Sequence, residues 1–454
     1  EGRKYGLEAT ATPKWEGAGT AAPLTLRAEN LSPDSAGRLR ASAKWPDVAL
    51  WDPDTPQHLY EVSMTLLDES GAALDELPPF ETGFREVRLA GKDVLLNGRP
   101  MHLRTTLYGD ATRPCLTTFA GAAEFCSRIK AMNFNSFNMN EAYVPGMPSY
   151  DDVYRAADRA GVLVMDAVVP RISDPPLDKN ALWKNAVMQG IFRGRAQRAV
   201  RAARRHPSVV LYKMNMNMTG EPYAMHAQHV ATNEIAPGAD ERDIRKSALW
   251  SAQCLNSIDP SRPAYNHDSG TLGDFTTKNI YLGWAPPRER ADFMEGWAKT
   301  GVKPVNWCEY GTPDSSRFQS FRRPYFIYRS PCWQRDTVAE SAAEWAFRDD
   351  EPTRRAMLAE DAHFAGESKV FQRGGMQGAV NGQWEQVAEI MGLFWGETLR
   401  GFRGWGLHGV LPWCWNRLYR YKTPVGRHRN PFAWQGLKEP GLTVEYISGE
   451  MGYG

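Results

Sequence analysis

The feature that most constrains this chain is a change in the spacing of its apolar residues near residue 88. Before that point, short runs such as 24–28 and 60–66 alternate apolar and polar residues, and clusters of turn-forming residues separate them. After it, short apolar runs alternate with longer stretches of helical spacing. Period-two alternation indicates antiparallel strands, whereas strands that alternate with helices indicate a parallel sheet. The chain is therefore expected to contain an all-β domain followed by an α/β domain.

These patterns predict an α/β fold in which an immunoglobulin-like β-sandwich precedes a (β/α)8 TIM barrel. We expect the sandwich over residues 1–88, the barrel over 89–430, and a C-terminal extension or linker over 431–454. The eight barrel strands are expected at 101–106, 134–139, 162–166, 209–215, 263–266, 279–282, 305–309 and 406–413.

One acidic residue ends a buried strand of this predicted barrel. Glu309 follows the apolar run 305–308 and precedes Tyr310 and Gly311. Catalytic groups of (β/α)8 barrels come from the C-terminal ends of strands. A glutamate there, with Trp307 and Tyr310 beside it, is able to attack a sugar carbon or to stabilise a cationic transition state. The same position also suits an acid that is paired with an arginine for structural reasons.

Composition excludes several kinds of partner. Lysine and arginine number 54 against 53 acidic residues, so the formal net charge of +1 does not favour binding to nucleic acid or to an anionic membrane. No apolar run of about 18 residues predicts a membrane-spanning helix. None of the six cysteines forms a CxxC pair, so a zinc site is not expected. Neither a metal nor an organic cofactor is expected. The 16 tryptophans suit both sugar stacking and core packing.

A helix expected over 182–205 carries six arginines. Such a stripe suits nucleic acid, but it also suits the solvated face of an outer barrel helix. We favour the second interpretation, with Val187, Ile191, Val200 and Ala203 facing inward. No nucleic-acid partner is expected.

Five stretches, taken in order, resemble glycoside hydrolase family 2, the family of β-galactosidases, β-glucuronidases and β-mannosidases. They are 50–60 (LWDPDTPQHLY), 82–86 with 96–100 (TGFRE and LNGRP), 158–166 (DRAGVLVMD), 206–212 (HPSVVLY) and 303–311 (KPVNWCEYG). No stretch resembles the family's usual N-terminal jelly-roll domain, so further domains of the same protein are expected beyond both ends. The resemblance implies a β-linked sugar or oligosaccharide as substrate, and this function class favours a secreted or periplasmic location.

The resemblance also implies a retaining mechanism with two carboxylates. Glu309 matches the nucleophile of the family. The position of the acid/base residue holds Asn217, whose amide cannot supply a proton at neutral pH. The acid is therefore expected elsewhere, with Glu221 on the same loop as the first candidate. The remaining candidates are Glu141, Asp166, His267 and Asp268.

Other polar and aromatic residues near strand ends are expected to bind the sugar. The polar set comprises Asn138, Glu141, Asp166, Asn215, Asn217, His267 and Asp268. Trp284 is expected as a wall of the site and Trp413 or Trp415 as its floor, although core packing explains these rings as well. Two other functions remain open, a catalytically dead carbohydrate-binding pseudoenzyme and a structural module of a larger polysaccharide-degrading protein.

Overall fold

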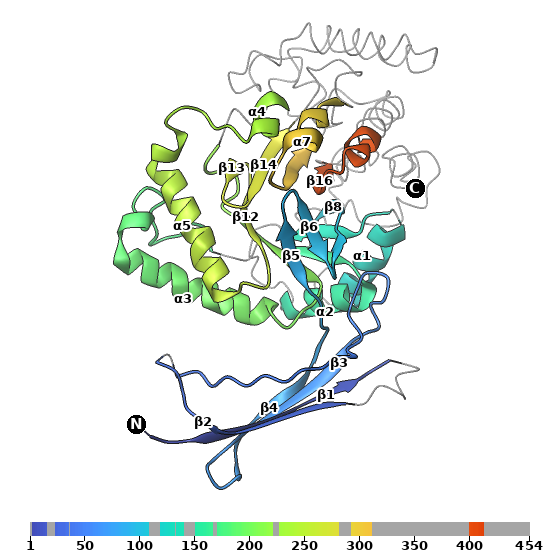
Figure 1. The fold of residues 1–454 in the computed structure, drawn as a ribbon, viewed down its shortest axis with the longest axis vertical. Helices are drawn as coiled ribbons and strands as arrows, with labels where there is room; N and C mark the ends of the chain where they lie inside the picture. The colour runs from blue at the N-terminus through green and yellow to red at the C-terminus, as the bar shows by residue number, and fades with distance from the viewer. Residues whose placement is uncertain are drawn as a thin grey trace, which may run out of the picture.

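The computed structural model describes ten segments of the chain (Figure 1). They are residues 2–15, 23–35, 37–108, 119–131, 133–139, 150–166, 170–220, 227–280, 292–310 and 399–412. An immunoglobulin-like β domain precedes an α/β barrel, as the sequence predicted. None of the helices in these segments has the length and apolar character needed to cross a membrane.

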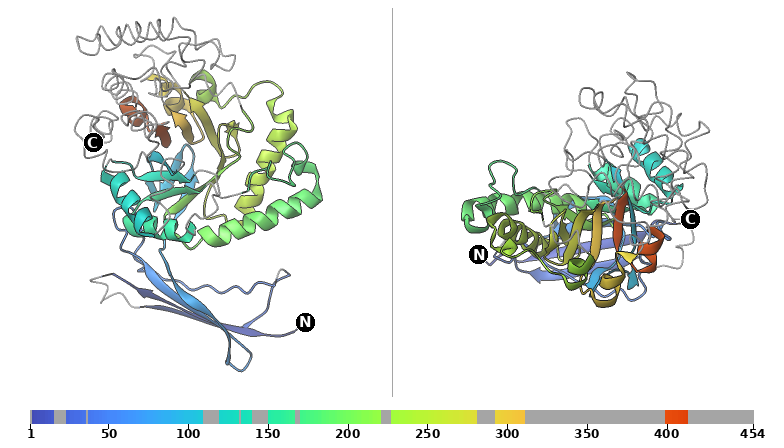
Figure 2. Two further views of the ribbon diagram at one scale, coloured as in Figure 1. Left: turned by 180° about the vertical axis from the view of Figure 1, so that it is seen from behind. Right: turned by 90° about the horizontal axis from the view of Figure 1, so that it is seen from above.

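The N-terminal domain contains a four-stranded antiparallel sheet in the order β2-β1-β3-β4. Its strands are β1 (Tyr5–Pro13), β2 (Leu24–Leu31), β3 (Tyr60–Leu67) and β4 (Ala73–Thr82). Residues 37–59 form turns and irregular backbone without strand pairing, and Trp45 packs its ring edge-on against Tyr60 and Phe84. In the described segments, the domain therefore has one sheet and an irregular segment beside it (Figure 2).

A small sheet connects this domain to the barrel. It consists of β5 (Val87–Ala90), β6 (Asp93–Leu96) and β7 (Arg99–Pro100). Asn97 and Gly98 both have positive φ, 51° and 80°, which is the geometry that an Asn-Gly hairpin turn requires. The boundaries expected at residues 88 and 430 stay predictions, and 431–454 lies outside the described segments.

Eight parallel strands form the barrel. They are β8 (Leu103–Tyr108), β9 (Ser136–Met139), β10 (Leu163–Asp166), β11 (Val209–Met214), β12 (Ala264–Asn266), β14 (Phe275–Ile280), β15 (Val305–Tyr310) and β16 (Gly409–Pro412). The last strand pairs with the first, since Gly409 lies opposite Leu103. β12 and β14 are linked by a side-chain hydrogen bond, in which the Thr277 hydroxyl donates to the Asn266 carbonyl at 2.5 Å.

The sixth barrel strand begins earlier in the chain than the sequence predicted. The sequence predicted a strand at 279–282, whereas β14 covers Phe275–Ile280 and is preceded by β13 (Gly270–Leu272), which pairs with it in antiparallel fashion. The polar residues Thr276 to Asn279 gave no apolar run to recognise. The turn between β13 and β14, with Gly273 at φ 65°, was the overlooked signal.

Helices cover the outside of the barrel (Figure 1). They are α1 (Phe119–Ala131), α2 (Tyr150–Ala160), η3 (Leu182–Lys184), α3 (Ala186–Ala203), α4 (Ala227–Thr232), η5 (Ala239–Glu241), α5 (Asp243–Ile258) and α7 (Glu295–Thr300). The inward face of α3 was partly mispredicted. Val187 is 73% exposed because it lies in the first turn of the helix, after the Asn185 cap, whereas Phe192 and Ala196 join Val200 and Ala203 in the core.

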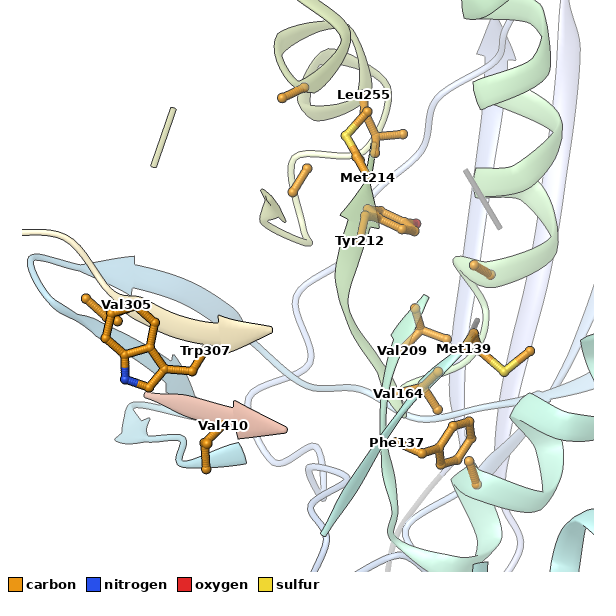
Figure 3. Packing of buried hydrophobic residues seen from close by; sticks show 14 of the residues in the cluster. Phe137, Met139, Val164, Val209, Tyr212, Met214, Leu255, Val305, Trp307 and Val410 are labelled. Carbon is orange, nitrogen blue, oxygen red and sulfur yellow. The ribbon is translucent and has the colours of Figure 1, made fainter. Parts of the chain in front are cut away.

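Buried apolar residues form two layers. Outward-facing strand residues such as Phe137 and Val164 pack toward the helices (Figure 3), and Trp307 belongs to the same cluster. The inner cluster fills the barrel with Leu163, Met165, Leu211, Tyr265, Phe275 and Cys308. Because side chains alternate along a strand, the residues two positions beyond Leu211 and Tyr265 also face inward. These residues are Lys213 and His267, and they lie near the C-terminal ends of their strands.

Candidate active site

Glu309 lies at the C-terminal end of β15 and is 7% exposed. The pairing with β14 skips one residue, since Lys278 lies opposite Trp307 and Asn279 lies opposite Glu309. Trp307 and Tyr310 both pack in the outer cluster, whereas Cys308 belongs to the inner one. The bulge therefore places Glu309 toward the barrel mouth while the flanking rings anchor the strand on the helix side.

His267 is the neighbour of Glu309 from the adjacent part of the barrel. It follows β12, is 1% exposed, and places Nε2 3.9 Å from Oε1 of Glu309. Burial, followed by the charges of Lys213 and Lys278, holds the pKa of this imidazole well below its usual value. His267 is therefore a neutral imidazole at neutral pH, and not the positive partner of an ion pair with Glu309.

A polar network extends from His267 to Asn217. Lys278 Nζ lies 2.7 Å from Oδ1 of Asp268, and the same oxygen accepts a hydrogen bond from the Asn279 backbone N–H at 3.1 Å. The amide Nδ2 of Asn279 donates to Oδ1 of Asn217 at 2.9 Å. The loops that follow β11 and β12 and the end of β14 are thus tied together beside Glu309.

Asn215 is held by structural hydrogen bonds. Its Oδ1 accepts from the Ile172 backbone N–H at 3.1 Å, and its Nδ2 donates to the Ser251 hydroxyl on α5 and to Asn266 Oδ1. This asparagine has φ 51°, and its bonds fix the turn after β11. Its role as a sugar ligand stays a prediction.

Asn138 lies on β9, two residues beyond Ser136, whose hydroxyl is bonded to that of Thr105. The Asn138 side chain is buried, and its Oδ1 has no hydrogen-bond partner among the described residues. A buried carbonyl oxygen of this kind requires a partner such as water or a ligand hydroxyl. The role of Asn138 as a sugar ligand stays a prediction.

Several predicted residues lie outside the described segments. Glu141, Glu221, Trp284, Trp413 and Trp415 are in this group. Asp166 ends β10, but the placement of its side chain is also outside the description. The roles expected for these residues stay predictions.

Two buried lysines were missed in the sequence. Lys213 on β11 is 2% exposed, and Lys278 on β14 is also buried. Lys213 stands in the run VVLYKM, which reads as an ordinary buried strand. The signal was a lysine two residues after the inward-facing Leu211. In the described part of the chain, no group of three or more metal-binding side chains is close enough to hold an ion.

Comparison with known proteins finds β-galactosidases among the relatives of this chain. The chain is 30% identical over 179 residues to a β-galactosidase of Aeromonas hydrophila, a match that covers 37% of this chain and 16% of that protein. It is 25% identical over 340 residues to a β-galactosidase of Erwinia tasmaniensis, covering 70% and 28% respectively. The chain therefore spans well under a third of the length of these curated relatives. No protein-family model matches the chain.

A solved structure supports the fold. β-Glucuronidase 2 of Bacteroides uniformis, covalently bound to cyclophellitol-6-carboxylate aziridine, superposes with a TM-score of 0.52 at 16% identity, over 91% of this chain and 42% of that chain. At this identity, the superposition concerns architecture alone.

The chain is thus similar to β-galactosidases in sequence and to a β-glucuronidase in fold, in agreement with its resemblance to glycoside hydrolase family 2. A β domain followed by a barrel is the arrangement that the sequence had suggested for this family, and the structure has it.

Proposed function

We propose that this chain carries the site of a β-glycosidase in which Glu309 is the nucleophile. The observation that supports this role most strongly is the position of Glu309, a nearly buried carboxylate at the C-terminal end of a barrel strand. This is the edge at which barrel enzymes assemble their catalytic groups. His267 is neutral at 3.9 Å, so it does not neutralise the carboxylate.

The chemistry follows from a carboxylate nucleophile. An oxygen of Glu309 attacks the anomeric carbon, the bond to the leaving oxygen breaks, and a proton must reach that oxygen. A glycosyl ester on Glu309 results, and water activated by the same acid/base group then hydrolyses it. The anomeric configuration is retained because it is inverted twice.

The proton donor is the unusual part of this site. Asn217 is an amide, His267 is neutral because its pKa is lowered, and Asp268 is engaged with Lys278 as an acceptor. We therefore place the acid outside these three residues, with Glu221 as the first candidate because it belongs to the loop that follows β11.

One observation favours a second function, that of a sugar-binding protein without turnover. At position 217, where the resemblance expects the acid, Asn279 holds an amide in place by a hydrogen bond. If no other group supplies a proton, natural glycosides with poor leaving groups would bind and remain intact.

Two variants on two substrate types test the proposal. Glu309→Gln keeps the shape of the side chain and removes the anion, so turnover of aryl and natural glycosides should fall by at least about a thousandfold. Glu221→Gln should reduce turnover of natural β-glycosides far more than that of nitrophenyl glycosides, because a nitrophenolate leaves without protonation. Turnover is measured with a panel of β-configured sugars.

The control for both variants is Glu295→Gln, which changes a half-buried acid paired with Lys299 on α7. This change should leave turnover unaltered. Near-wild-type turnover in Glu309→Gln would refute the nucleophile assignment. Equal losses on both substrate types in Glu221→Gln would transfer the search to Glu141 and Asp166. Saturable sugar binding without any turnover would establish the second function.

A further inference from the structure

Helix α3 and the two residues after it (186–205) carry six arginines and no acidic residue. Two of the arginines have partners within the protein. Arg195 donates to the carbonyls of Asp174 and Pro175, and Arg205 pairs with Asp151. The other four are exposed, and we call them the α3 arginine face: Arg193, Arg198, Arg201 and Arg204. In the part of the chain that the structure describes, none of these four is paired with a carboxylate.

The four side chains lie on one side of the helix. An α-helix takes 3.6 residues per turn, so they fall within an arc of about 140°, and their rise along the axis is about 17 Å. Phe192, Ala196 and Val200 are on the opposite side and pack into the core. The exposed amide of Gln197 lies within the same arc as the arginines. Because α3 lies on the outside of the barrel (Figure 1), this face is open to a partner.

Helix stability alone does not account for the α3 arginine face. On α1 and α2, Arg128 and Arg155 each pair with an acid of the same helix, an arrangement that stabilises a helix. On α3, like charges three residues apart repel one another instead. The helix dipole favours a cation in the last turn, which explains Arg201 but not Arg193 and Arg198.

We propose that the α3 arginine face is a docking surface for an acidic polysaccharide, whose carboxylate or sulfate groups bind the guanidinium groups. The formal net charge of the whole chain is only +1, so the four unpaired guanidinium groups are a local positive surface. Guanidinium binds oxyanions through paired N–H donors, and the amide of Gln197 has a donor and an acceptor for sugar hydroxyls.

Two other anionic partners fit this face less well. Helices that bind lipid surfaces insert an apolar face, whereas the apolar side of α3 is buried in the barrel. Surfaces that bind single-stranded nucleic acid stack bases on aromatic rings, whereas the one aromatic residue of α3, Phe192, is buried. The choice of a polysaccharide rests on the proposed function, since a β-glycosidase acts on sugars.

The α3 arginine face lies away from the candidate active site. The Arg205 carbonyl, just after α3, accepts a hydrogen bond from the Thr82 hydroxyl of the N-terminal domain. This end of α3 therefore lies at the base of the barrel, whereas Glu309 lies at the C-terminal ends of the strands. Polysaccharide bound to α3 would be retained by the protein without contacting the reacting atoms, so the surface should affect the binding of polymers and not the turnover of small glycosides.

The first measurement is binding, which does not require turnover. Heparin, polygalacturonate and uncharged dextran are titrated separately into the chain by isothermal titration calorimetry, and the wild type should bind an acidic polymer but not dextran. Changing Arg198, Arg201 and Arg204 together to Gln, which keeps helix propensity, should raise the dissociation constant by about tenfold or more. Changing the same three residues to Lys keeps the charge and should retain most of the affinity.

The matched control changes Arg27, Arg88 and Lys299 to Gln, which removes the same charge from exposed residues that are paired with acids. Its dissociation constant should equal that of the wild type. If the triple glutamine variant of α3 does not fold, Arg201→Gln alone must weaken binding by about twofold or more. Equal losses in the α3 variant and the control, no binding of either acidic polymer, or tighter binding of DNA or of anionic lipid vesicles would overturn the proposal.

The second measurement separates docking from catalysis. In the triple glutamine variant, kcat/KM for nitrophenyl glycosides should be unchanged, whereas KM for an acidic polysaccharide that the wild type hydrolyses should rise by about the same tenfold as the dissociation constant. Reduced turnover of nitrophenyl glycosides in the folded variant would overturn the placement of the surface away from the active site. A wild-type chain without turnover would refute the proposed function, and the binding measurements would still decide whether α3 holds an acidic polysaccharide.

Discussion

His206 shows how one buried side chain organises the outer layer of the barrel. Its Nδ1 lies 2.6 Å from Oδ2 of Asp158, and its Nε2 lies 3.0 Å from Oδ1 of Asp151. Both acids belong to α2, whereas His206 precedes β11. Burial opposes protonation, but the hydrogen bonds to the two carboxylates outweigh it and raise the pKa of His206 above its usual value. The imidazole thus connects helix and strand.

This arrangement predicts how stability depends on pH. A histidine whose pKa is higher in the folded state contributes fully below its unfolded pKa and loses that contribution as pH rises through the folded pKa. The melting temperature of the wild type should therefore fall as pH increases above about 6.5, the usual histidine value. His206→Asn should lower the free energy of unfolding by about 3 kcal/mol at pH 6, because Asp158 is left buried without this partner. Thermal denaturation between pH 5 and pH 9, monitored by circular dichroism at fixed ionic strength, measures both effects. If the melting temperature of His206→Asn depended on pH in the same way as that of the wild type, the result would contradict this interpretation of His206.

The sequence could identify some residues of the site but not others. Glu309 was recognisable because an acid ended a clear apolar strand and the motif around it resembled a family. Lys213 was not, because the direction of a side chain depends on strand register, which the sequence alone does not fix. The bonds that occupy Asn215 were equally hidden, since Ile172 and Ser251 approach it from distant parts of the chain.

At the scale of elements, the turn between α2 and β10 determines how the N-terminal domain meets the barrel. Gly161 adopts φ 67° in this turn, and its Cα lies against the backbone of Pro53. A Cβ at this position would approach the Pro53 carbonyl more closely than real Cβ atoms do. The turn therefore needs glycine for both conformation and space.

Gly161→Ala should accordingly destabilise the protein by more than about 2 kcal/mol, since the left-handed conformation alone costs about 1–2 kcal/mol. Gly190→Ala is the matched control, because Gly190 lies inside α3 with open space around it. That change should stabilise by about 0.5–1 kcal/mol through helix propensity. Urea denaturation of the two variants gives both values. If both variants changed the free energy of unfolding equally, or if Gly161→Ala left it unchanged, the backbone around Pro53 would not be rigid.

Most barrel elements were predictable, because buried parallel strands are short apolar runs bounded by turns. β11 lies within the predicted range of 209–215, and β15 contains the predicted strand and continues one residue beyond Glu309. β14 was displaced because polar side chains replace the apolar signal where the strand approaches the site. The elements that diverge most from simple patterns thus contribute the polar groups of the barrel mouth.

At the scale of the whole molecule, the N-terminal domain is fastened to the base of the barrel. Trp51 is fully buried and donates to the Asp158 carbonyl at 2.9 Å. Arg85 donates to the backbone carbonyls of Pro207 and Val209. Arg159 donates to the Glu81 carboxylate through Nε and Nη2. These contacts lie at the opposite end of the strands from Glu309. The domain therefore supports the barrel without entering the candidate site, in agreement with an account in which the loops after the strands carry the chemistry.

The central claim is that Glu309 forms a covalent bond with a sugar, and covalent labelling tests it most directly. The chain is incubated with aziridine analogues of a panel of β-configured sugars, and the adduct is located by peptide mass spectrometry. One adduct per chain is expected, on Glu309, and none in Glu309→Gln. An adduct on another carboxylate, equal labelling of Glu309→Gln, or no adduct with any analogue under conditions where natural glycosides are hydrolysed would contradict the account.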